Sequence, residues 1–288
     1  MDETRLEHRE GEKVSFLSGR QPLFDYRYGA GSPKPYVHPF YAPNGVPLTL
    51  LSPTDHVHHR GLMLAWTNVN GFDFLGETDA GEKGRILHQR FEKVVSAPIA
   101  EITAINYWVG GGKAWLIERR TLRACPMASE VVWLDWESEL EPWRDPVTIR
   151  AEHEYPVPGR AGYNGLGVRF RTSMNSGKPL NALGARSVRE ANGQRAAWCA
   201  FDGPLEEGGR AGMAIFDHPR NLRHPAPFYV AAGKTFSYLS AAPTFHQAIH
   251  LKPGDLLCLR WAVLTFLGEA NRRRLEDLYR DWSGKEQA

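Results

Sequence analysis

Cysteine is scarce in this chain, with Cys125, Cys199 and Cys258 the only three among 288 residues. They lie far apart, are odd in number and show no CxxC spacing, which argues against both a disulfide framework and a cysteine-rich zinc site. Such cysteine usage is typical of a reducing compartment, so we expect a cytoplasmic location.

Long hydrophobic runs are also missing. No segment approaches the roughly 18 consecutive apolar residues that a membrane helix needs. Residues 1–5 are charged and no apolar segment follows them, which is unlike a signal peptide. We therefore expect no membrane partner.

Neither sign of charge dominates, because 35 Lys and Arg residues and 33 Asp and Glu residues leave a net charge of +2. No run of basic residues alternates with aromatic residues, so the composition does not indicate a nucleic-acid partner. The chain also lacks the spacing of a phosphate-binding loop, an HExxH pair and a GxSxG nucleophile motif. These absences turn attention away from the common nucleotide-binding, metalloprotease and serine-hydrolase classes.

What the chain does contain is a strong β-strand pattern. Five runs of about ten residues follow one another, beginning near Arg85, Ile99, Lys113, Ser129 and Pro146. In the fourth run, apolar and polar residues alternate as they do in a half-buried antiparallel strand. Such a meander needs a second sheet to cover its apolar face.

Clear helical periodicity is confined to the carboxyl end. Leu275, Leu278, Tyr279 and Trp282 recur at i, i+3, i+4 and i+7, which predicts one amphipathic helix that docks on a sheet. No internal repeat or linker-like segment interrupts the chain. The predicted fold is therefore all-β: one antiparallel β-supersandwich domain over residues 1–288 with a C-terminal helix.

Histidine is concentrated in the stretch Asp55-His56-Val57-His58-His59-Arg60. The unperturbed pKa of histidine, about 6.5, is the closest to neutrality of any side chain, so such a cluster suits either proton transfer or metal binding. If the stretch is extended, His56, His58 and Arg60 face one way and His59 the other. A polar loop whose histidines bond to backbone carbonyls is the non-functional alternative.

Other candidates are spread along the chain. His218 and His224 each precede a proline in the segment that follows an apolar strand, and loops at strand ends often carry binding residues. Arg169 follows a glycine-rich turn, where its guanidinium fork suits a hydroxyl-rich or anionic ligand as well as a surface salt bridge. Glu118 shares a strand face with Arg120, so burial would raise its pKa while the arginine lowers it.

Two further positions and a set of aromatic residues complete the candidates. His38 lies beside a proline on a predicted strand, and Asp73 lies between two aromatic residues in a loop. Tryptophan rings are suitable platforms for a sugar ring, although most tryptophans of a chain this size belong to the core. The candidate platforms are Trp66, Trp108, Trp115 and Trp198.

Five motifs, in this order, resemble a known family. They are Lys34-Pro35-Tyr36-Val37-His38-Pro39, Asp55-His56-Val57-His58-His59-Arg60-Gly61, Asn70-Gly71-Phe72-Asp73-Phe74, Gly165-Leu166-Gly167-Val168-Arg169 and Phe216-Asp217-His218-Pro219-Arg220-Asn221-Leu222-Arg223-His224-Pro225. Over about residues 20–282 the chain resembles the bacterial family once labelled "PmoA", after a methane oxygenase subunit, and later classed as a domain of unknown function. The label does not suit this sequence, because that subunit is an integral membrane protein and no spanning segment is present here.

The resemblance implies a carbohydrate-related role. Members of the family tend to occur beside sugar oxidoreductases and carbohydrate-degradation genes, and their fold looks like the galactose-mutarotase-type supersandwich. No established catalytic residues accompany the resemblance. The roles expected of individual residues therefore come from their own chemistry.

We expect the candidate residues to converge on one cleft, because acid–base catalysis needs two groups of intermediate pKa within hydrogen-bond reach of the substrate. The predicted function is an epimerase, mutarotase or lyase that acts on a small carbohydrate, a sugar or keto-sugar, without metal or cofactor. A zinc-type site of three imidazoles, which the neighbouring Arg60 opposes, and a non-catalytic carbohydrate-binding protein are the alternatives. The predicted catalytic residues are His56, His58, His59 and His218, and the predicted substrate-binding residues are His38, Arg60, Asp73, Glu118, Arg169 and His224.

Overall fold

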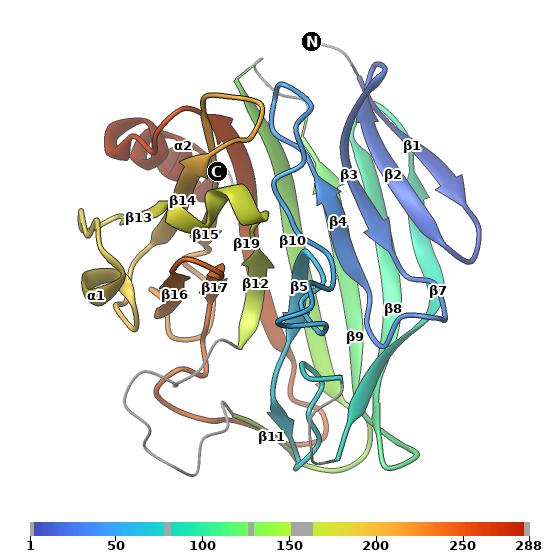
Figure 1. Ribbon diagram of the computed structural model, residues 1–288. Coiled ribbons are helices and arrows are strands. Elements are labelled where there is room, and N and C mark those ends of the chain that lie inside the picture. The colour runs from blue at the N-terminus through green and yellow to red at the C-terminus, as the bar shows by residue number, and fades with distance from the viewer. Residues whose placement is uncertain (1–2, 78–81, 126–129, 151–163, 285–288) are drawn as a thin grey trace.

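Two large antiparallel sheets face each other in the computed structural model of the chain, which describes residues 3–77, 82–125, 130–150 and 164–284 (Figure 1). Sheet I, toward the viewer in Figure 1, has the strand order β1 (Thr4–Arg9), β2 (Lys13–Ser18), β3 (Gln21–Arg27), β4 (Tyr36–Phe40), β5 (Leu62–Ala65), β12 (Gly165–Arg169), β17 (Ser237–Ala241) and β16 (Phe228–Ala232). Sheet II has the order β13 (Lys178–Asn181), β14 (Trp198–Pro204), β15 (Arg210–Asp217), β19 (Leu257–Leu267), β10 (Val131–Pro142), β9 (Lys113–Ala124), β8 (Ala100–Gly110) and β7 (Gly84–Val95). A small third sheet consists of β18 (Ile249–Leu251), β11 (Val147–Arg150) and β6 (Asn68–Val69).

The long strands of sheet II form where the sequence pattern predicts them. β7, β8, β9 and β10 are antiparallel neighbours in chain order, so four of the five expected runs form the meander. The fifth run forms β11 instead, which pairs with β18 and β6 in the third sheet, and its residues after Arg150 lie outside the described ranges. Gly111 and Gly112 connect β8 to β9 and have φ values of 60° and 74°. Positive φ at both positions is what a tight two-residue hairpin turn requires, and glycine adopts it without steric cost.

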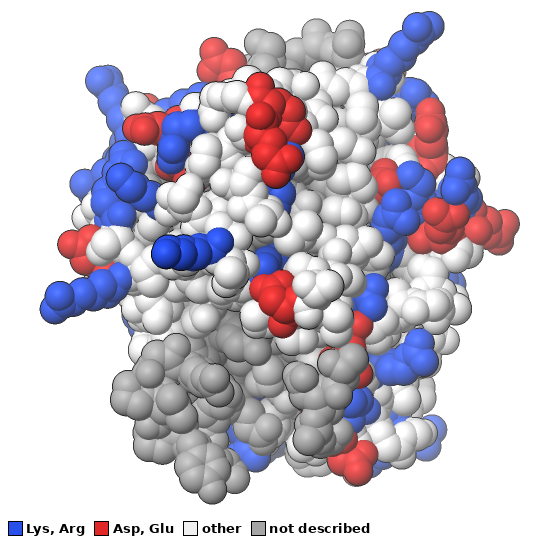
Figure 2. All heavy atoms as spheres, in the orientation of Figure 1, with Lys and Arg blue, Asp and Glu red and all other residues white. Residues whose placement is uncertain are grey.

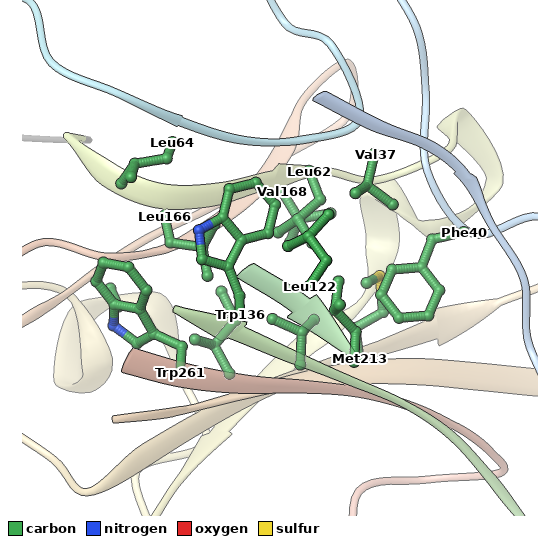
Figure 3. Packing of buried hydrophobic residues seen from close by; sticks show 14 of the residues in the cluster. Val37, Phe40, Leu62, Leu64, Leu122, Trp136, Leu166, Val168, Met213 and Trp261 are labelled. Carbon is green, nitrogen blue, oxygen red and sulfur yellow. The ribbon is translucent and has the colours of Figure 1, made fainter. Parts of the chain in front are cut away.

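The main core lies between the two sheets. Successive side chains of a strand point to opposite faces, so every second residue along a strand faces this core. Figure 3 shows where they meet: Val37, Phe40, Leu62, Leu64, Leu166 and Val168 from sheet I, and Leu122, Trp136, Met213 and Trp261 from sheet II. Burial of each such side chain contributes about 1.5–3 kcal/mol, which makes this layer the main attraction between the sheets.

The outer face of sheet II is covered by α2 (Arg272–Gly284), which confirms the predicted amphipathic helix. Leu275, Tyr279 and Trp282 are buried against the sheet, and the indole Nε1 of Trp282 donates to Asp135 Oδ1 at 2.8 Å. Trp133 and Asp135, on the outer face of β10, are therefore buried beneath the helix. The other helices, η1 (Thr172–Ser176) and α1 (Val188–Ala191), are short.

The predicted all-β antiparallel sandwich with a C-terminal helix is confirmed. That residues 1–288 form a single domain stays a prediction. Within the ranges that the structure describes, no helix is long and apolar enough to cross a membrane. Figure 2 views the molecule from the side of sheet I, where charged side chains gather toward the left and right edges and some acidic side chains also lie near the middle.

Candidate functional site

The candidate site is built on the outer face of sheet I, the face turned away from the main core. Tyr36 of β4, Met63 of β5 and Tyr238 of β17 form a small buried cluster there together with Leu75. Between β5 and β17 runs β12, whose Gly167 presents no side chain to this cluster. A Cβ atom added at Gly167 would collide with the phenol of Tyr238, so the tyrosine lies across the strand only because position 167 is glycine.

Residues 52–61 cross this cluster as a pair of turns, so the alternation of faces considered for an extended chain does not arise. The amide of His56 donates to the carbonyl of Pro53 at 3.0 Å, and the amide of His59 donates to the carbonyl of His56 at 2.9 Å. These turns bring residues three apart onto one side, whereas a strand would have separated His56 from His59. The signal for the turns is present in the sequence, because proline followed by Thr54 and Asp55 is turn chemistry.

The three imidazoles form one cluster with two aromatic rings, and we refer to His56, His58 and His59 as the histidine cluster. His56 stacks on His59 with ring centroids 4.6 Å apart and planes 10° apart, and the ring of His58 lies edge-on 4.6 Å from His59. Phe236 stacks on His56 at 4.8 Å, and Tyr238 stacks beneath His59 at 4.9 Å. His59 is fully buried, while the side chain of His56 is 36% exposed at the edge.

Asp55 joins the histidine cluster to Arg169. Its Oδ2 lies 2.9 Å from Nδ1 of His56 and accepts a 2.8 Å hydrogen bond from Nη2 of Arg169. Burial acts to raise the pKa of Asp55, but the hydrogen bonds from His56 and Arg169 outweigh it and the pKa is lowered. Asp55 is therefore a carboxylate at neutral pH. The guanidinium of Arg169, at the end of β12, lies over the ring of Phe236 at 4.4 Å.

A second charged group, Lys34, Arg60 and Glu77, lies on the same face. Arg60 donates to both carboxylate oxygens of Glu77, at 2.7 and 2.6 Å, and stacks over Tyr36. Lys34 donates to Glu77 Oε1 at 2.6 Å and to the carbonyl of Leu75 at 2.9 Å. Burial lowers the pKa of Lys34 to about 8 although Glu77 opposes the change. Burial acts to raise the pKa of Glu77, yet the bonds from Arg60 and Lys34 lower it overall.

Asp73 shapes the turn that carries Glu77. Its Oδ1 accepts from the amides of Leu75 and Gly76 at 2.9 and 2.8 Å, and its Oδ2 pairs with Lys83 at 2.9 Å. These bonds serve the local backbone and one lysine. This geometry supports a positioning role for the predicted substrate-binding residue.

His38 lies on β4 and is held by Thr49, whose hydroxyl is 2.9 Å from Nδ1. Burial, reinforced by the positive charge of Arg27, lowers the pKa of His38 to about 4. The ring is therefore neutral at physiological pH. Within the described residues, the ring contacts of the histidine cluster do not include His38.

His218 and His224 do not join the histidine cluster, and the prediction of one shared cleft is wrong. They follow β15 of sheet II, where His218 lies edge-on against Trp282 of α2 at 5.1 Å. His224 is bound through Nδ1 to Asp217 at 2.8 Å and lies 3.4 Å from the hydroxyl of Tyr279. Both therefore lie on the helix-covered outer face of sheet II, and the main core separates them from the outer face of sheet I.

The His-Pro segment has a structural explanation of its own. Asp217 accepts from His224, from the amide of Ala226 at 2.9 Å and from Asn221 Nδ2 at 2.7 Å. Asn221 also bonds both backbone groups of Arg260, each at 2.7 Å. The polar side chains thus tie the turn to β19 and α2, which accounts for their presence without a ligand.

Glu118 lies inside the sandwich, away from the histidine cluster. Both of its oxygens accept from Arg120 at 2.8 Å, and it also accepts from Ser138 Oγ at 2.7 Å and Trp108 Nε1 at 3.1 Å. The expected pairing with Arg120 is present. The prediction that Glu118 binds substrate does not hold, because its side chain is fully enclosed and its oxygens are occupied.

Three of the four candidate sugar platforms are also enclosed. Trp66, Trp108 and Trp198 have no exposed surface, so their rings pack only against protein. Trp115 is partly buried and packs beside Phe72. The three enclosed tryptophans are core residues and cannot serve as sugar platforms.

No set of three or more His, Cys, Asp or Glu side chains within the described ranges is arranged to hold a metal ion. The parallel stacking of His56 on His59 explains part of this, because stacked rings present their faces to each other rather than their nitrogens. The cations Arg169 and Lys34 add to the positive charge around the histidines, as the pKa of His59 shows.

Several residues of the site escaped the sequence reasoning. Glu77 stands in no motif, and Lys34 is only the first residue of the motif that ends at Pro39, because the role of each depends on the bond between them across the fold. Phe236 and Tyr238 do leave a signal in the sequence, because two aromatic residues spaced by two share one face of an extended chain. In the sequence Asp55 is only a neighbour of the histidines, whereas in the fold it connects them to Arg169.

Buried neutral histidines predict that the protein loses stability in mild acid. Burial lowers the pKa of His59, His38 and His88, the last two to about 4. The unfolded chain then binds more protons below about pH 6.5, so stability is present above that pH and is lost as pH falls toward 4. Each histidine contributes a slope of up to about 1.4 kcal/mol per pH unit. Urea denaturation across this window measures the slope.

His38→Asn should flatten that pH dependence, because a partly buried titrating ring is removed. His250→Asn is the control, since His250 is exposed on β18. Equal slopes in the wild type and His38→Asn would contradict the prediction.

Gly167→Ala should destabilise the fold by about 1–3 kcal/mol, the usual cost of overpacking a filled site. The new methyl group would collide with the phenol ring of Tyr238 and displace it from beneath His59. Gly31→Ala is the matched control, because a Cβ there meets nothing within 4 Å. Chemical denaturation of the two variants checks the difference, and losses of equal size would refute the steric argument.

The comparisons with solved structures find distant likenesses of fold. The α-galactosidase from Lactobacillus brevis matches with TM-score 0.41 and 11% identity, over 92% of this chain and 39% of that one. A GalM/aldose epimerase homologue from C. elegans matches with TM-score 0.40 and 12% identity, over 94% of this chain and 100% of that one. The galactosidase domain of the α-galactosidase-sucrose kinase AgaSK gives TM-score 0.39 and 10% identity, over 92% of this chain and 40% of that one.

This chain thus spans only 39% and 40% of the two galactosidase structures. No curated protein matches it. The family comparison is decisive by contrast, because one family model covers residues 13–280. The chain belongs to that family, DUF6807, a family of unknown function.

Proposed function

We propose that the histidine cluster on the outer face of sheet I is the active site of a carbohydrate-active enzyme. The reaction moves a proton on or off a carbon or ring oxygen of a sugar or keto-sugar, as an epimerase, mutarotase or lyase does. His218 and His224 are not part of this proposal, because the structure places them beside α2.

The observation that carries the proposal is the Asp55–His56 pair. The carboxylate of Asp55 holds Nδ1 of His56 at 2.9 Å, and the side chain of His56 is 36% exposed. When Nδ1 carries the proton shared with Asp55, Nε2 carries the lone pair, which is the arrangement of a general base oriented by a carboxylate. A histidine that only supports a loop has no need of such a partner at an exposed edge.

The neighbours of the pair supply the other parts that proton transfer requires. His58 is a second imidazole, with its ring centroid 5.6 Å from that of His56, and serves as the acid that returns the proton. Arg169 provides a fixed positive charge for an oxyanion or enolate that forms during the reaction. His59 is buried and its pKa is lowered, so it stays neutral and acts as a spacer beneath His56.

The carbohydrate part of the proposal is supported by the family resemblance and by the aromatic lining. Tyr229 and Tyr238 lie on the same outer face, with ring centroids 6.2 Å apart. Tyr229 is only partly buried and lies toward the sheet edge formed by β16. Aromatic faces of this kind pack against the apolar face of a sugar ring.

The proposal is tested by a panel of sugars and 3-keto-sugars incubated with the protein in deuterated buffer and followed by NMR. We expect exchange of one carbon-bound proton. The exchange should be lost in His56→Ala and kept in His250→Ala, because the side chain of His250 is exposed on β18. Exchange that persists in His56→Ala would overturn the proposal. Binding without exchange across the whole panel would favour a carbohydrate-binding protein, and loss of exchange with a chelator would favour a metalloenzyme.

A further inference from the structure

The site carries more positive than negative charge. Three cations, Lys34, Arg60 and Arg169, share two carboxylates, Asp55 and Glu77, within the described part of the chain. Glu77 alone serves both Lys34 and Arg60. The side chain of Lys34 is fully buried and that of Glu77 is 11% exposed, so water screens this excess only weakly.

Arg169 has hydrogen-bond donors that no acceptor in the described part of the chain uses. The residue is 2% exposed, and its Nη2 donates to Asp55 and to the carbonyl of Thr235 at 3.1 Å. Its Nε and Nη1 atoms are buried and have no acceptor among the residues that the structure describes. Leaving such donors unsatisfied costs free energy, which an acceptor supplied by a ligand would recover.

The same excess of positive charge is felt at His59. Burial lowers its pKa most, and the next contributions come from His58, His56, Arg169 and Lys34, all of which oppose a further positive charge there. A region in which these four basic groups oppose a further positive charge favours an anion. The single net positive charge from the permanent ions matches a carboxylate with its one negative charge.

We infer that this site takes an acidic sugar, a uronate or aldonate, whose carboxylate binds beside Arg169. This rests on the proposed function and names its substrate class. The carboxylate enters at the edge formed by Asp55 and His56, where the side chains are 34% and 36% exposed. Asp55 bonds to both Arg169 and His56, so these two side chains lie on either side of it. A substrate carboxylate at Arg169 therefore has its adjacent carbon near His56.

This placement gives the reaction a defined course. His56 Nε2 removes the proton from the carbon next to the carboxylate, and the pair of electrons of that C–H bond moves to form an enediolate whose oxygen charge Arg169 stabilises. Return of a proton from His58 on the opposite face inverts the carbon. Departure of a group from the next carbon with its bonding electrons gives an unsaturated sugar acid instead.

Calorimetry on the wild-type protein tests the inference. The acids are glucuronate, galacturonate and gluconate. Each is compared with its neutral counterpart, and the uronates also with their methyl esters. We expect the free acids to bind at least about tenfold more tightly than the esters, since charge-assisted hydrogen bonds are the stronger ones. The comparison with esters needs no variant, so it remains valid even where substitutions at position 169 impair folding.

Substitution adds a second arm. Arg169→Gln should weaken binding of the acids by about 10- to 100-fold, and Arg169→Lys should retain part of it. Arg171→Gln is the matched control, because Arg171 lies two residues on and pairs with Glu206 and Glu207 at 3.4 and 3.0 Å.

The two proposals fail separately. Tight binding of the acids without proton exchange would leave the carboxylate site standing and remove the catalytic proposal. Exchange on neutral keto-sugars with no preference for acids over esters would overturn the carboxylate site and leave the catalytic proposal standing.

Discussion

Glu118→Leu should destabilise the protein by about 3–5 kcal/mol, because it leaves a buried arginine without its counter-ion. Glu118 and Arg120 have fully buried side chains and form a two-bond ion pair between the sheets. Arg120 also stacks on Trp136 at 4.7 Å and donates to the carbonyl of Pro35 at 3.3 Å, so it cannot turn toward water without disrupting the core. Urea denaturation measures the loss.

Two further variants separate this effect from a general sensitivity of sheet II. Glu92→Gln removes a carboxylate that pairs with Arg119 on the surface, where the side chains are 41% and 45% exposed, and should cost no more than about 1 kcal/mol. The double variant Glu118→Leu/Arg120→Met removes both charges and should recover most of the stability. A double variant as unstable as Glu118→Leu alone would show that the loss comes from packing and not from the stranded charge.

The sequence predicted the elements whose signal is local. The strand runs between residues 85 and 150 and the stripe of Leu275, Tyr279 and Trp282 appear in the structure as β7 to β11 and α2. Alternation and helical spacing report which face of an element is apolar, and burial enforces that face. The pairing of Glu118 with Arg120 was visible for the same reason, since residues two apart on a strand share a face.

The sequence could not tell which face of the sandwich a residue occupies. Two stacked sheets have two outer faces, and a histidine after a strand can belong to either. His58 and His218 carry similar local chemistry, yet one lies against sheet I and the other against α2 on sheet II. Only the long-range pairing of strands separates them, as in the pairing of β5 with β12, about 100 residues apart in sequence.

Loop conformation was the second limit. The assumption of an extended chain at residues 55–60 grouped His56 with His58 and Arg60, whereas the turns group His56 with His59. The third limit concerns the partners of charged residues, because Glu77 bonds to Arg60 and Lys34 from a different loop. These contacts depend on tertiary packing, which a single sequence leaves open.

His56→Ala should lower the turnover number by about 10²- to 10⁴-fold, the usual contribution of a positioned acid or base. The Michaelis constant should change far less, because Arg169 and the aromatic rings that contact the ligand stay in place. Steady-state exchange kinetics on the sugar acid that binds best provide the measurement. Asp55→Asn should lower the turnover number by a smaller factor, since an amide still accepts from Nδ1 of His56 but lacks the charge that orients and stabilises the ring.

Added imidazole distinguishes a catalytic loss from a structural one. The side chain of His56 is 36% exposed, so its removal opens a space at the surface of the cluster that a small base can enter. Imidazole should therefore restore part of the activity of His56→Ala and none of the activity of Asp55→Asn, in which the ring is still present. His218→Ala is the complementary control, because His218 packs on Trp282 and its loss should lower stability while the turnover number stays near the wild-type value. A large fall in turnover for His218→Ala with full activity in His56→Ala would move the active site to the α2 side of the molecule.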